Sequence, residues 1–144
     1  MRNPIKHGLL LGATCAVFSH IALAAPSHNV PPNGAPEPVV TPLMTKPLPD
    51  MPGKEALMIT VDYPPGAADP IHRHDAHAFV YVLEGSIVMQ VQGGKEVTLT
   101  PGQTYYEGPD DIHTVGRNAS QTKPAKFVVV LIKKRGAPAL IPIE

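Results

Sequence analysis

The chain has 144 residues, of which 43% are hydrophobic, and its twelve basic and twelve acidic residues give a formal net charge of zero. This length predicts one domain, and the balanced charge argues against the basic surface that binds nucleic acid or anionic lipid. The only cysteine, Cys15, lies in a segment that we expect to be removed, so we expect neither a disulfide framework nor a thiolate metal site.

The first 24 residues have the pattern of a secretory signal peptide. Arg2 and Lys6 precede an apolar stretch, and Ala22, Leu23 and Ala24 supply the small-residue cleavage site. We therefore expect cleavage after about Ala24 and export to the periplasm or the medium. A membrane span needs about 20 apolar residues, so we expect no stable membrane anchor after cleavage. An uncleaved N-terminal anchor is the alternative.

Residues 25–38 are rich in proline and contain almost nothing that can enter a core, which predicts a disordered or extended leader. The next segment contains apolar residues between prolines, which is typical of an edge strand. Such a strand would cover a sheet or a neighbouring subunit. Its apolar residues are Val39, Val40, Leu43, Met44 and Leu48.

From residue 55 onward the sequence predicts strand after strand. The segments are short, rich in β-branched and aromatic residues, and separated by turn residues; they cover residues 56–63, 78–85, 86–93, 96–102 and 125–133. No helical periodicity longer than two turns is present. This pattern predicts an all-β sandwich or barrel. We expect residues 134–144 to form a tail, with Leu140 and Ile141 packed against the barrel.

Four histidines of this region lie beside turns: His72, His74, His77 and His113. His72 and His74 are two residues apart and share one face of an extended segment. His113 begins another predicted strand, which an antiparallel barrel can bring beside that pair. Three converging imidazoles suit Fe, Mn, Co, Ni, Cu or Zn. The alternative is a set of partly solvated side chains, since the spacing matches no closed structural zinc site.

The wider spacing resembles the two motifs of the cupin superfamily, usually written G-x5-H-x-H-x3/4-E-x6-G and G-x5-P-x-G-x2-H-x3-N. The residues that carry the resemblance are Gly66, His72, His74 and Gly85 in the first motif and Gly102 and His113 in the second. The resemblance covers residues 39–133. It implies a single double-stranded β-helix, or jelly-roll, barrel that holds a metal on the three motif histidines and is often a homodimer.

The first motif departs from the family at its carboxylate ligand. That ligand would fall at position 78, where this chain has Ala78, directly after His77. In an unbroken strand His77 points away from the face shared by His72 and His74, but a turn at Asp75 would let it face the metal. His77 is therefore a fourth metal ligand, a polar residue at the rim, or a hydrogen-bond donor that orients another ligand.

The second motif offers Glu107, at the end of the apolar segment 104–107. A carboxylate there is costly unless it is paired or bound. Glu107 is expected to supply the charge that Ala78 lacks, to act as a catalytic general base, or to face solvent. Tyr106 is a candidate catalytic hydrogen-bond donor; with Tyr81 and Tyr105 it either lines the pocket or packs in the barrel.

These residues predict one divalent transition metal, Fe, Mn, Ni, Cu or Zn, with room for a small-molecule ligand. A divalent ion on three neutral ligands keeps a net positive charge and favours an anionic or chelating oxygen ligand. We expect a dioxygenase, lyase or isomerase that acts on a small acidic or enolisable molecule, the dioxygenase by analogy with other three-histidine members. The alternatives are a non-catalytic periplasmic metal or small-molecule binding protein and a metal-free barrel.

Overall fold

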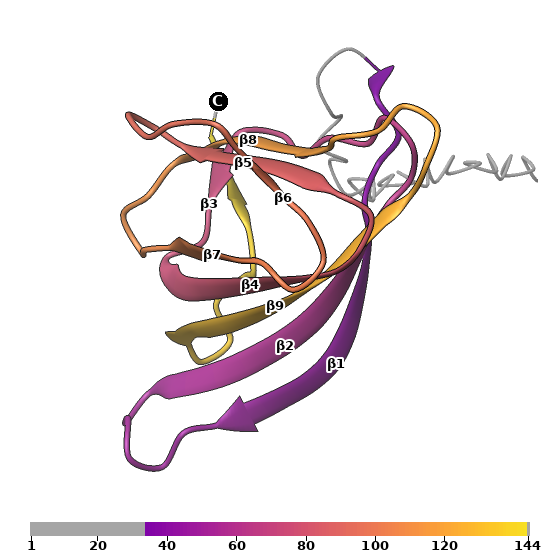
Figure 1. Ribbon diagram of the computed structural model, residues 1–144. Helices are drawn as coiled ribbons and strands as arrows, with labels where there is room; N and C mark the ends of the chain where they lie inside the picture. The colour runs from indigo at the N-terminus through magenta and orange to yellow at the C-terminus, as the bar shows by residue number, and fades with distance from the viewer. Residues whose placement is uncertain (1–33, 144) are drawn as a thin grey trace, which may run out of the picture.

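The computed structural model describes residues 34–143, which form two antiparallel sheets of five strands each (Figure 1). The first sheet has the order β1-β2-β9-β4-β7 and the second the order β10-β3-β8-β5-β6. In chain order the strands are β1 (Val39–Pro47), β2 (Lys54–Tyr63), β3 (His72–Arg73), β4 (Ala76–Glu84), β5 (Ile87–Val91), β6 (Val97–Leu99), β7 (Thr104–Glu107), β8 (His113–Asn118), β9 (Ala125–Lys134) and β10 (Ile141–Pro142).

The expected all-β class is confirmed, and the strands expected from residue 55 onward are found as β2, β4, β5, β6 and β9. Among residues 34–143 no helix is long and apolar enough to cross a membrane. The expected signal peptide, residues 1–24, and most of the expected leader, residues 25–38, lie outside the described residues.

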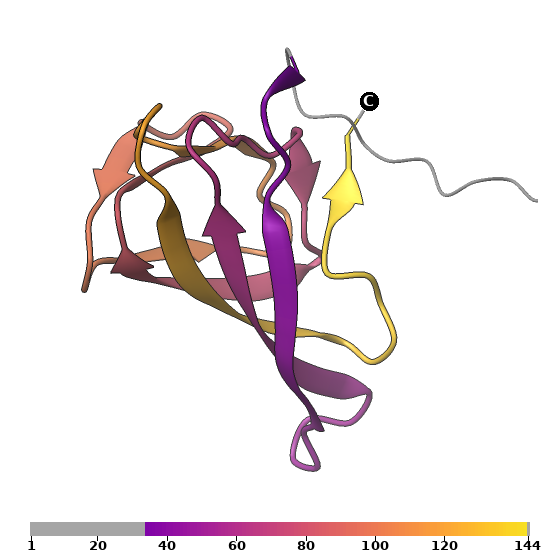
Figure 2. The same cartoon turned by 90° about the vertical axis from the view of Figure 1, so that its right-hand side faces the viewer.

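The proline-interrupted segment forms β1, the edge strand of the first sheet, as expected. It pairs with β2 only, and its register shifts between Pro42 and Met44. Proline cannot donate to a ladder and is tolerated at an edge. The hairpin of β1 and β2 extends beyond the barrel in both views (Figures 1 and 2), which leaves all nine residues of β1 exposed.

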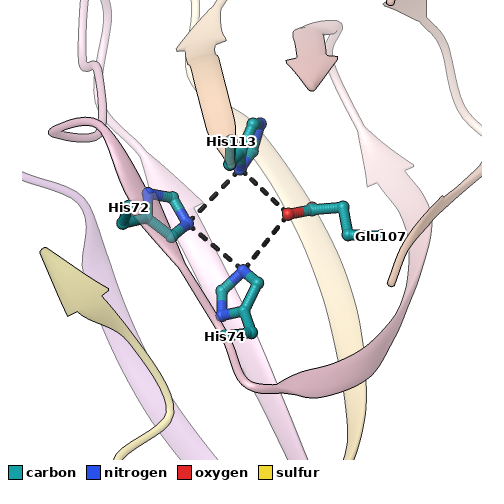
Figure 3. Close-up of side chains that lie close together, drawn as sticks. All are labelled: His72, His74, Glu107 and His113. Carbon is teal, nitrogen blue, oxygen red and sulfur yellow. Dashed lines mark hydrogen bonds and ion pairs between the residues drawn. The ribbon is translucent and has the colours of Figure 1, made fainter. Parts of the chain in front are cut away.

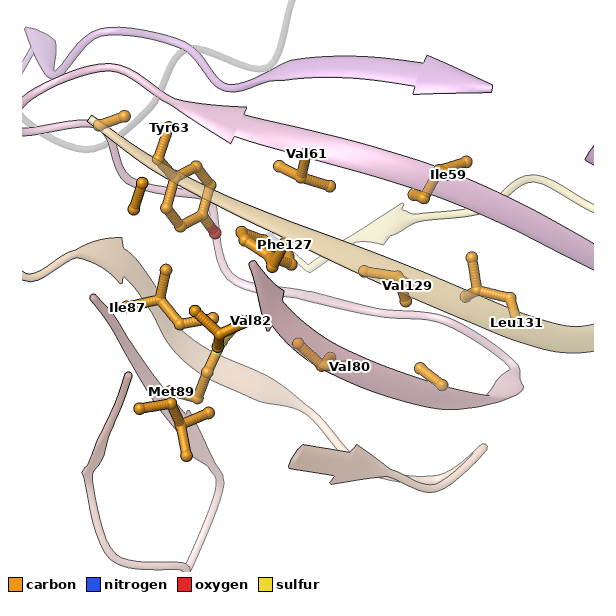
Figure 4. Close-up of a cluster of buried hydrophobic side chains, with 14 of the residues drawn as sticks. Ile59, Val61, Tyr63, Val80, Val82, Ile87, Met89, Phe127, Val129 and Leu131 are labelled. Atoms are coloured by element: carbon orange, nitrogen blue, oxygen red, sulfur yellow. The ribbon is translucent and has the colours of Figure 1, made fainter. Parts of the chain in front are cut away.

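The core lies between the two sheets (Figure 4). Buried residues alternate with exposed ones along β4 and with half-buried ones along β9, because successive side chains of a strand point to opposite faces. The buried residues of these strands meet Ile87 and Met89 of β5. Burying a large apolar side chain contributes about 1.5–3 kcal/mol, so this layer holds the sheets together. Its largest members include Tyr63, Val82, Ile87, Met89, Phe127 and Leu131.

Two turns with left-handed backbone carry the chain between the sheets. Asp75, with φ of 47°, joins β3 to β4, and Gly85, with φ of 68°, joins β4 to β5. A Cβ on Gly85 would lie 2.4 Å from the carbonyl oxygen of Pro124 and 2.8 Å from Cα of Ala125. Only glycine fits this turn, both for its φ and for the close approach of the backbone.

Asn118 fixes the end of β8 against the loops around it. Its side chain is almost fully buried, and its Nδ2 lies within 3.1 Å of the carbonyl oxygens of Tyr63, Pro64 and Lys123. Its Oδ1 accepts a hydrogen bond from the backbone N–H of Ser120 at 2.8 Å. These contacts tie β8 to the end of β2 and so position the strand that carries His113.

The short strand β3 lies between β8 and β10 in the second sheet. His72 is the cross-strand partner of His113 on one side and of Pro142 on the other. Figure 2 shows β10 running beside β3 near the C-terminus. Residues far apart in the sequence are thereby brought to the same end of the barrel.

Candidate metal centre

His72 and His74 lie on one face of the segment that contains β3, and backbone carbonyls fix both rings. His72 Nδ1 lies 2.8 Å from the oxygen of Pro70, and His74 Nδ1 lies 2.6 Å from the oxygen of Ala139. Because a carbonyl only accepts, each Nδ1 carries the proton and donates it. Each Nε2 is therefore left with a free lone pair, and the two Nε2 atoms lie only 3.2 Å apart.

His113 reaches the same point from β8. It is buried, and its Nδ1 lies 3.3 Å from His72 Nε2. The expectation that an antiparallel pairing brings this strand beside the first histidines is confirmed, since His72 and His113 are cross-strand partners. The three histidines of the expected ligand set thus converge.

Glu107 completes the group from the end of β7. The residue is 2% exposed, so the alternative in which it faces solvent is wrong. Its Oε2 lies 3.3 Å from His74 Nε2 and 3.2 Å from His113 Nδ1 (Figure 3). Its cross-strand partner is Ala78, the position where the family motif has its carboxylate. The carboxylate therefore comes from the neighbouring strand.

The four donor atoms fit a transition metal. They form a closed ring with edges of 3.2–3.3 Å, and all lie within 4.8 Å of one another. A tetrahedral ion with ligand distances of about 2.0–2.1 Å spaces its ligands about 3.3 Å apart. Two lone pairs that face each other at this distance repel. A single proton can form a hydrogen bond along only one edge of the ring, so the repulsion along the other edges remains. Glu107 Oε2 is buried without a hydrogen-bond partner among the described residues. Imidazole and carboxylate together suit first-row divalent ions.

Burial determines the charge of two of the histidines. It lowers the pKa of His72 to about 4 and lowers the pKa of His113 as well. Both rings are neutral at pH 7, which is the form that binds metal. Burial also opposes the charged forms of His74 and Glu107, but their mutual attraction outweighs it, so the pKa of His74 is raised and that of Glu107 is lowered. The cluster therefore contains one carboxylate among imidazoles at neutral pH.

The cluster lines a cavity of about 90 Å³. Most of its wall is apolar and comes from Val40, Ile59, Val61, Val80, Met89, Phe127, Val129 and Leu131. Ala139 and Leu140 line it from the segment that follows β9, so the expectation that Leu140 packs against the barrel is confirmed. A cavity of this volume has room for several water molecules or for a ligand of few heavy atoms.

Two parts of this site were missed by sequence reasoning. Asp69 lines the cavity three residues before His72, the first histidine of the cluster, and the sequence predicted no role for it. The segment 137–143, expected to be a tail, supplies the Ala139 carbonyl and the strand β10. Every residue has a backbone carbonyl, so the sequence cannot indicate which carbonyl contacts a site. An aspartate shortly before a histidine pair is a sequence signal that could have indicated a further polar residue of the site.

The structure corrects the expectations for His77 and Tyr106. Both side chains are exposed on the outer face of the first sheet, where His77 Nδ1 lies 2.7 Å from Tyr106 Oη. The turn at Asp75 does interrupt the strand, but Ala76 and Ala78 still point into the barrel. Strand alternation therefore keeps His77 outside. Neither residue belongs to the four-residue cluster.

Comparison with known proteins agrees with this architecture. The sequence profile of the cupin domain matches residues 59–131, about half of the chain. The chain belongs to the cupin family. The match begins in β2 and ends in β9, so it includes all four residues of the cluster. No curated protein matches the sequence.

Solved structures confirm the double-stranded β-helix of this cupin. It is similar to a double-stranded β-helix protein from Klebsiella pneumoniae, with 20% identity over 78% of this chain and 90% of that chain and a TM-score of 0.59. It is also similar to the polyketide cyclase RemF from Streptomyces resistomycificus, with 21% identity over 77% and 74% of the two chains and a TM-score of 0.56.

A third similar structure is the DMSP lyase DddQ from Ruegeria pomeroyi, with 21% identity and a TM-score of 0.53. The match covers 60% of this cupin and only 42% of the lyase, so the chain spans less than half the length of that protein. At these identities the three likenesses show a shared fold.

Proposed function

We propose that this cupin binds one divalent transition metal, Fe, Mn, Ni, Cu or Zn, on His72, His74, His113 and Glu107. We further propose that it uses the site to bind or transform a small acidic or enolisable molecule. The observation that carries the proposal is the ring of four buried donor atoms with edges of 3.2–3.3 Å. Nε2 of His72 and Nε2 of His74 each have a free lone pair, because Nδ1 of the same imidazole carries the proton and donates it to a backbone carbonyl.

The charge and size of the site favour a small anion. A divalent ion beside one carboxylate keeps a net positive charge, which attracts a carboxylate or enolate oxygen. When bound, such an ion polarises a carbonyl as a Lewis acid. The apolar wall lowers the local dielectric constant, which strengthens electrostatic interactions inside the cavity. Lyase, isomerase and dioxygenase chemistry are the reaction classes that this arrangement supports.

The position of Glu107 supports a ligand role in place of the expected general base. Its Oε2 points into the ring of nitrogens, and no other carboxylate of the described chain belongs to the group. A base for substrate chemistry would then have to come from elsewhere on the cavity wall.

The test begins with elemental analysis of the untagged protein. The proposal predicts about one equivalent of a transition metal that is absent from His72→Ala. Turnover is then sought with small oxo and hydroxy acids, with oxygen uptake recorded in parallel. Metal without turnover of any acid would favour the non-catalytic binding protein. No metal in the purified protein and none taken up on titration would overturn the proposal.

Export remains part of the proposal and rests on the sequence of residues 1–24, with a basic start, an apolar stretch and small residues before the cleavage site. Mass spectrometry of the protein from the periplasm or the medium should find a chain that begins near Ala25. A full-length chain retained in the cytoplasm would contradict export.

We also propose a homodimer, supported by the outer face of β4, β7 and β9. Phe79, Tyr81 and Tyr106 are each about half exposed there, and they border a groove of about 630 Å³ with Val128 and Val130. An exposed aromatic and aliphatic face of this kind marks an interaction site. Sedimentation analysis should find a dimer that Phe79→Asp converts to monomer. A monomeric wild-type protein would contradict the assignment.

A further inference from the structure

Tyr63 and Asp69 form a buried polar pair beside the metal centre. Tyr63 is fully buried at the end of β2, and its hydroxyl donates to Asp69 Oδ2. The backbone N–H of Asp69 donates to the carbonyl oxygen of Gly116 at 2.7 Å. Gly116 belongs to β8, the strand that carries His113. The carboxylate is therefore fixed at its backbone and at one oxygen, relative to the strand that bears a candidate ligand.

Gly116 makes room for this pair. A Cβ at that position would lie 2.6 Å from Asp69 Oδ2, 3.0 Å from His113 Cε1 and 3.2 Å from Tyr63 Oη. These distances show that the carboxylate, the phenol and the imidazole surround one point on β8. Since the lack of a side chain at Gly116 lets all three approach, the strand brings the pair next to the cluster.

Asp69 is the one polar side chain outside the cluster among the described residues that line the cavity. The remaining wall is apolar apart from the four cluster residues. No cation pairs with Asp69; the hydroxyl of Tyr63 is its one side-chain hydrogen-bond partner in the described chain. A ligand in the cavity thus has a single carboxylate available to exchange a proton with it, because Glu107 is directed into the ring of donor atoms.

We propose that Asp69 is the general acid–base of this cavity, that Tyr63 positions it, and that the substrate is a small oxo acid with an acidic C–H beside its carbonyl. This inference rests on the proposed function and names the catalytic group that the metal centre itself does not provide. Tyr63 does not reach the cavity wall and acts through Asp69.

The proton transfer balances without any further reactant. The α C–H bond of the oxo acid breaks, its proton forms an O–H bond with the Asp69 carboxylate, and the electron pair moves to the carbonyl oxygen to give the enolate. The proton on Asp69 exchanges with solvent, and Asp69 then returns a proton to the same carbon while the carbonyl re-forms, which restores the oxo acid and gives net exchange of its C–H proton.

The pKa of the Asp69 carboxyl agrees with a role as general acid–base. Burial raises its pKa to about 6, although the hydrogen bond from Tyr63 acts in the opposite direction. A general acid–base works best when its pKa lies near the operating pH. The pKa of the Tyr63 phenol is raised far above its ordinary value by the same burial, so the phenol remains protonated and donates throughout the neutral range.

The experiment compares the wild type with Asp69→Asn and Tyr63→Phe, each loaded with Co²⁺ and with metal content checked by elemental analysis. The probe is pyruvate. Its binding is measured from the visible spectrum of the bound Co²⁺, and exchange of its methyl protons in D₂O is followed by nuclear magnetic resonance. Asparagine keeps an oxygen that accepts from Tyr63 but cannot take up a proton, so this variant separates catalysis from folding.

We expect Asp69→Asn to retain the metal, to bind pyruvate within about threefold of the wild type, and to lose about 100-fold or more of the exchange rate. We expect Tyr63→Phe to shift the acid limb of the exchange profile to higher pH, because the lost hydrogen bond raises the pKa of Asp69. Equal exchange rates in Asp69→Asn and wild type, or no exchange by the Co²⁺-loaded wild type, would overturn the inference. Failure to bind Co²⁺ would instead contradict the proposed metal site.

Discussion

Glu107 on β7 is the cross-strand partner of Ala78 on β4, and both side chains are buried on the inner face of the first sheet. Residues directly opposite each other in an antiparallel pair have Cβ atoms about 4.5–5.5 Å apart. A carboxylate that starts from either position can therefore reach the same point in the barrel. The chain lacks the carboxylate of the family motif at Ala78 but still has a carboxylate at the ring of imidazoles.

This relationship predicts that the carboxylate can be moved between strands. Glu107→Ala should lower the metal affinity by at least about 100-fold, since it removes a donor and its charge. The double variant Ala78→Glu/Glu107→Ala should recover most of that loss in a calorimetric titration. Glu84→Ala is the matched control, because Glu84 is an exposed carboxylate on β4. A double variant that binds no better than Glu107→Ala would show that position 78 does not serve the site.

Substitutions of the histidines should differ sharply in their effect on metal affinity. His72→Ala and His113→Ala should each lose about 100-fold or more in metal affinity, whereas His77→Ala should bind as the wild type does. His77 is the control because it lies on the other face of the sheet and contacts Tyr106. Elemental analysis after dialysis measures the outcome. Loss of metal from His77→Ala, or its retention in the other two variants, would contradict the assignment.

Much of this architecture could be predicted because it depends on side-chain periodicity. The alternation along β4 and β9 and the proline-interrupted β1 follow from local sequence, and so does the convergence of His72 and His113 once an antiparallel barrel is assumed. The roles of Glu107, Asp69 and Ala139 could not be predicted in the same way. The sequence left three roles open for Glu107, and the solvent-facing one is excluded only by its burial opposite Ala78 in the pairing of β4 with β7. The Ala139 contact is made by a backbone carbonyl, which any residue supplies.

The segment that returns to the site is held by a buried ion pair. Lys133 Nζ donates to Glu55 Oε1 and, at 2.7 Å, to the carbonyl oxygen of Ala137, while Glu55 accepts from the backbone N–H of Gly136 at 3.1 Å. Removing one partner of such a pair leaves the other charge without its partner, which is destabilising. Lys133→Met should therefore lower the free energy of unfolding measurably in a denaturant titration.

Two comparisons sharpen this prediction. The double variant Glu55→Met/Lys133→Met should be close to wild type in stability, because apolar residues often replace a buried pair at little cost. Arg117→Met breaks the exposed pair with Glu96 and should cost less than about 1 kcal/mol. Equal losses in Lys133→Met and Arg117→Met would show that burial does not govern the Lys133 pair.

The carbonyl of Ala139 should tune the metal site through His74. It accepts from His74 Nδ1 at 2.6 Å and so directs the free Nε2 toward the other donors. Truncation after Gly136 removes this partner and β10, and should weaken metal binding by about 10–100-fold while circular dichroism still shows a folded barrel. Leu140→Ala keeps the carbonyl and should bind metal normally. Unchanged affinity in the truncated chain would contradict a role for this segment.

The raised pKa of Asp69 should be visible in the stability of the metal-free protein. The pKa of this carboxyl is about 6 in the folded chain against an ordinary value of 3.8. The folded state therefore holds its proton more tightly, so this contribution to stability is fully present below pH 3.8 and is lost as the pH rises through about 6. Asp69→Asn has no such dependence. Relative to wild type, the variant should gain up to about 3 kcal/mol between pH 4 and pH 7. Denaturant titrations at both pH values measure this difference, and one that does not change, or that changes in the opposite direction, would show that the folded environment does not favour the protonated carboxyl.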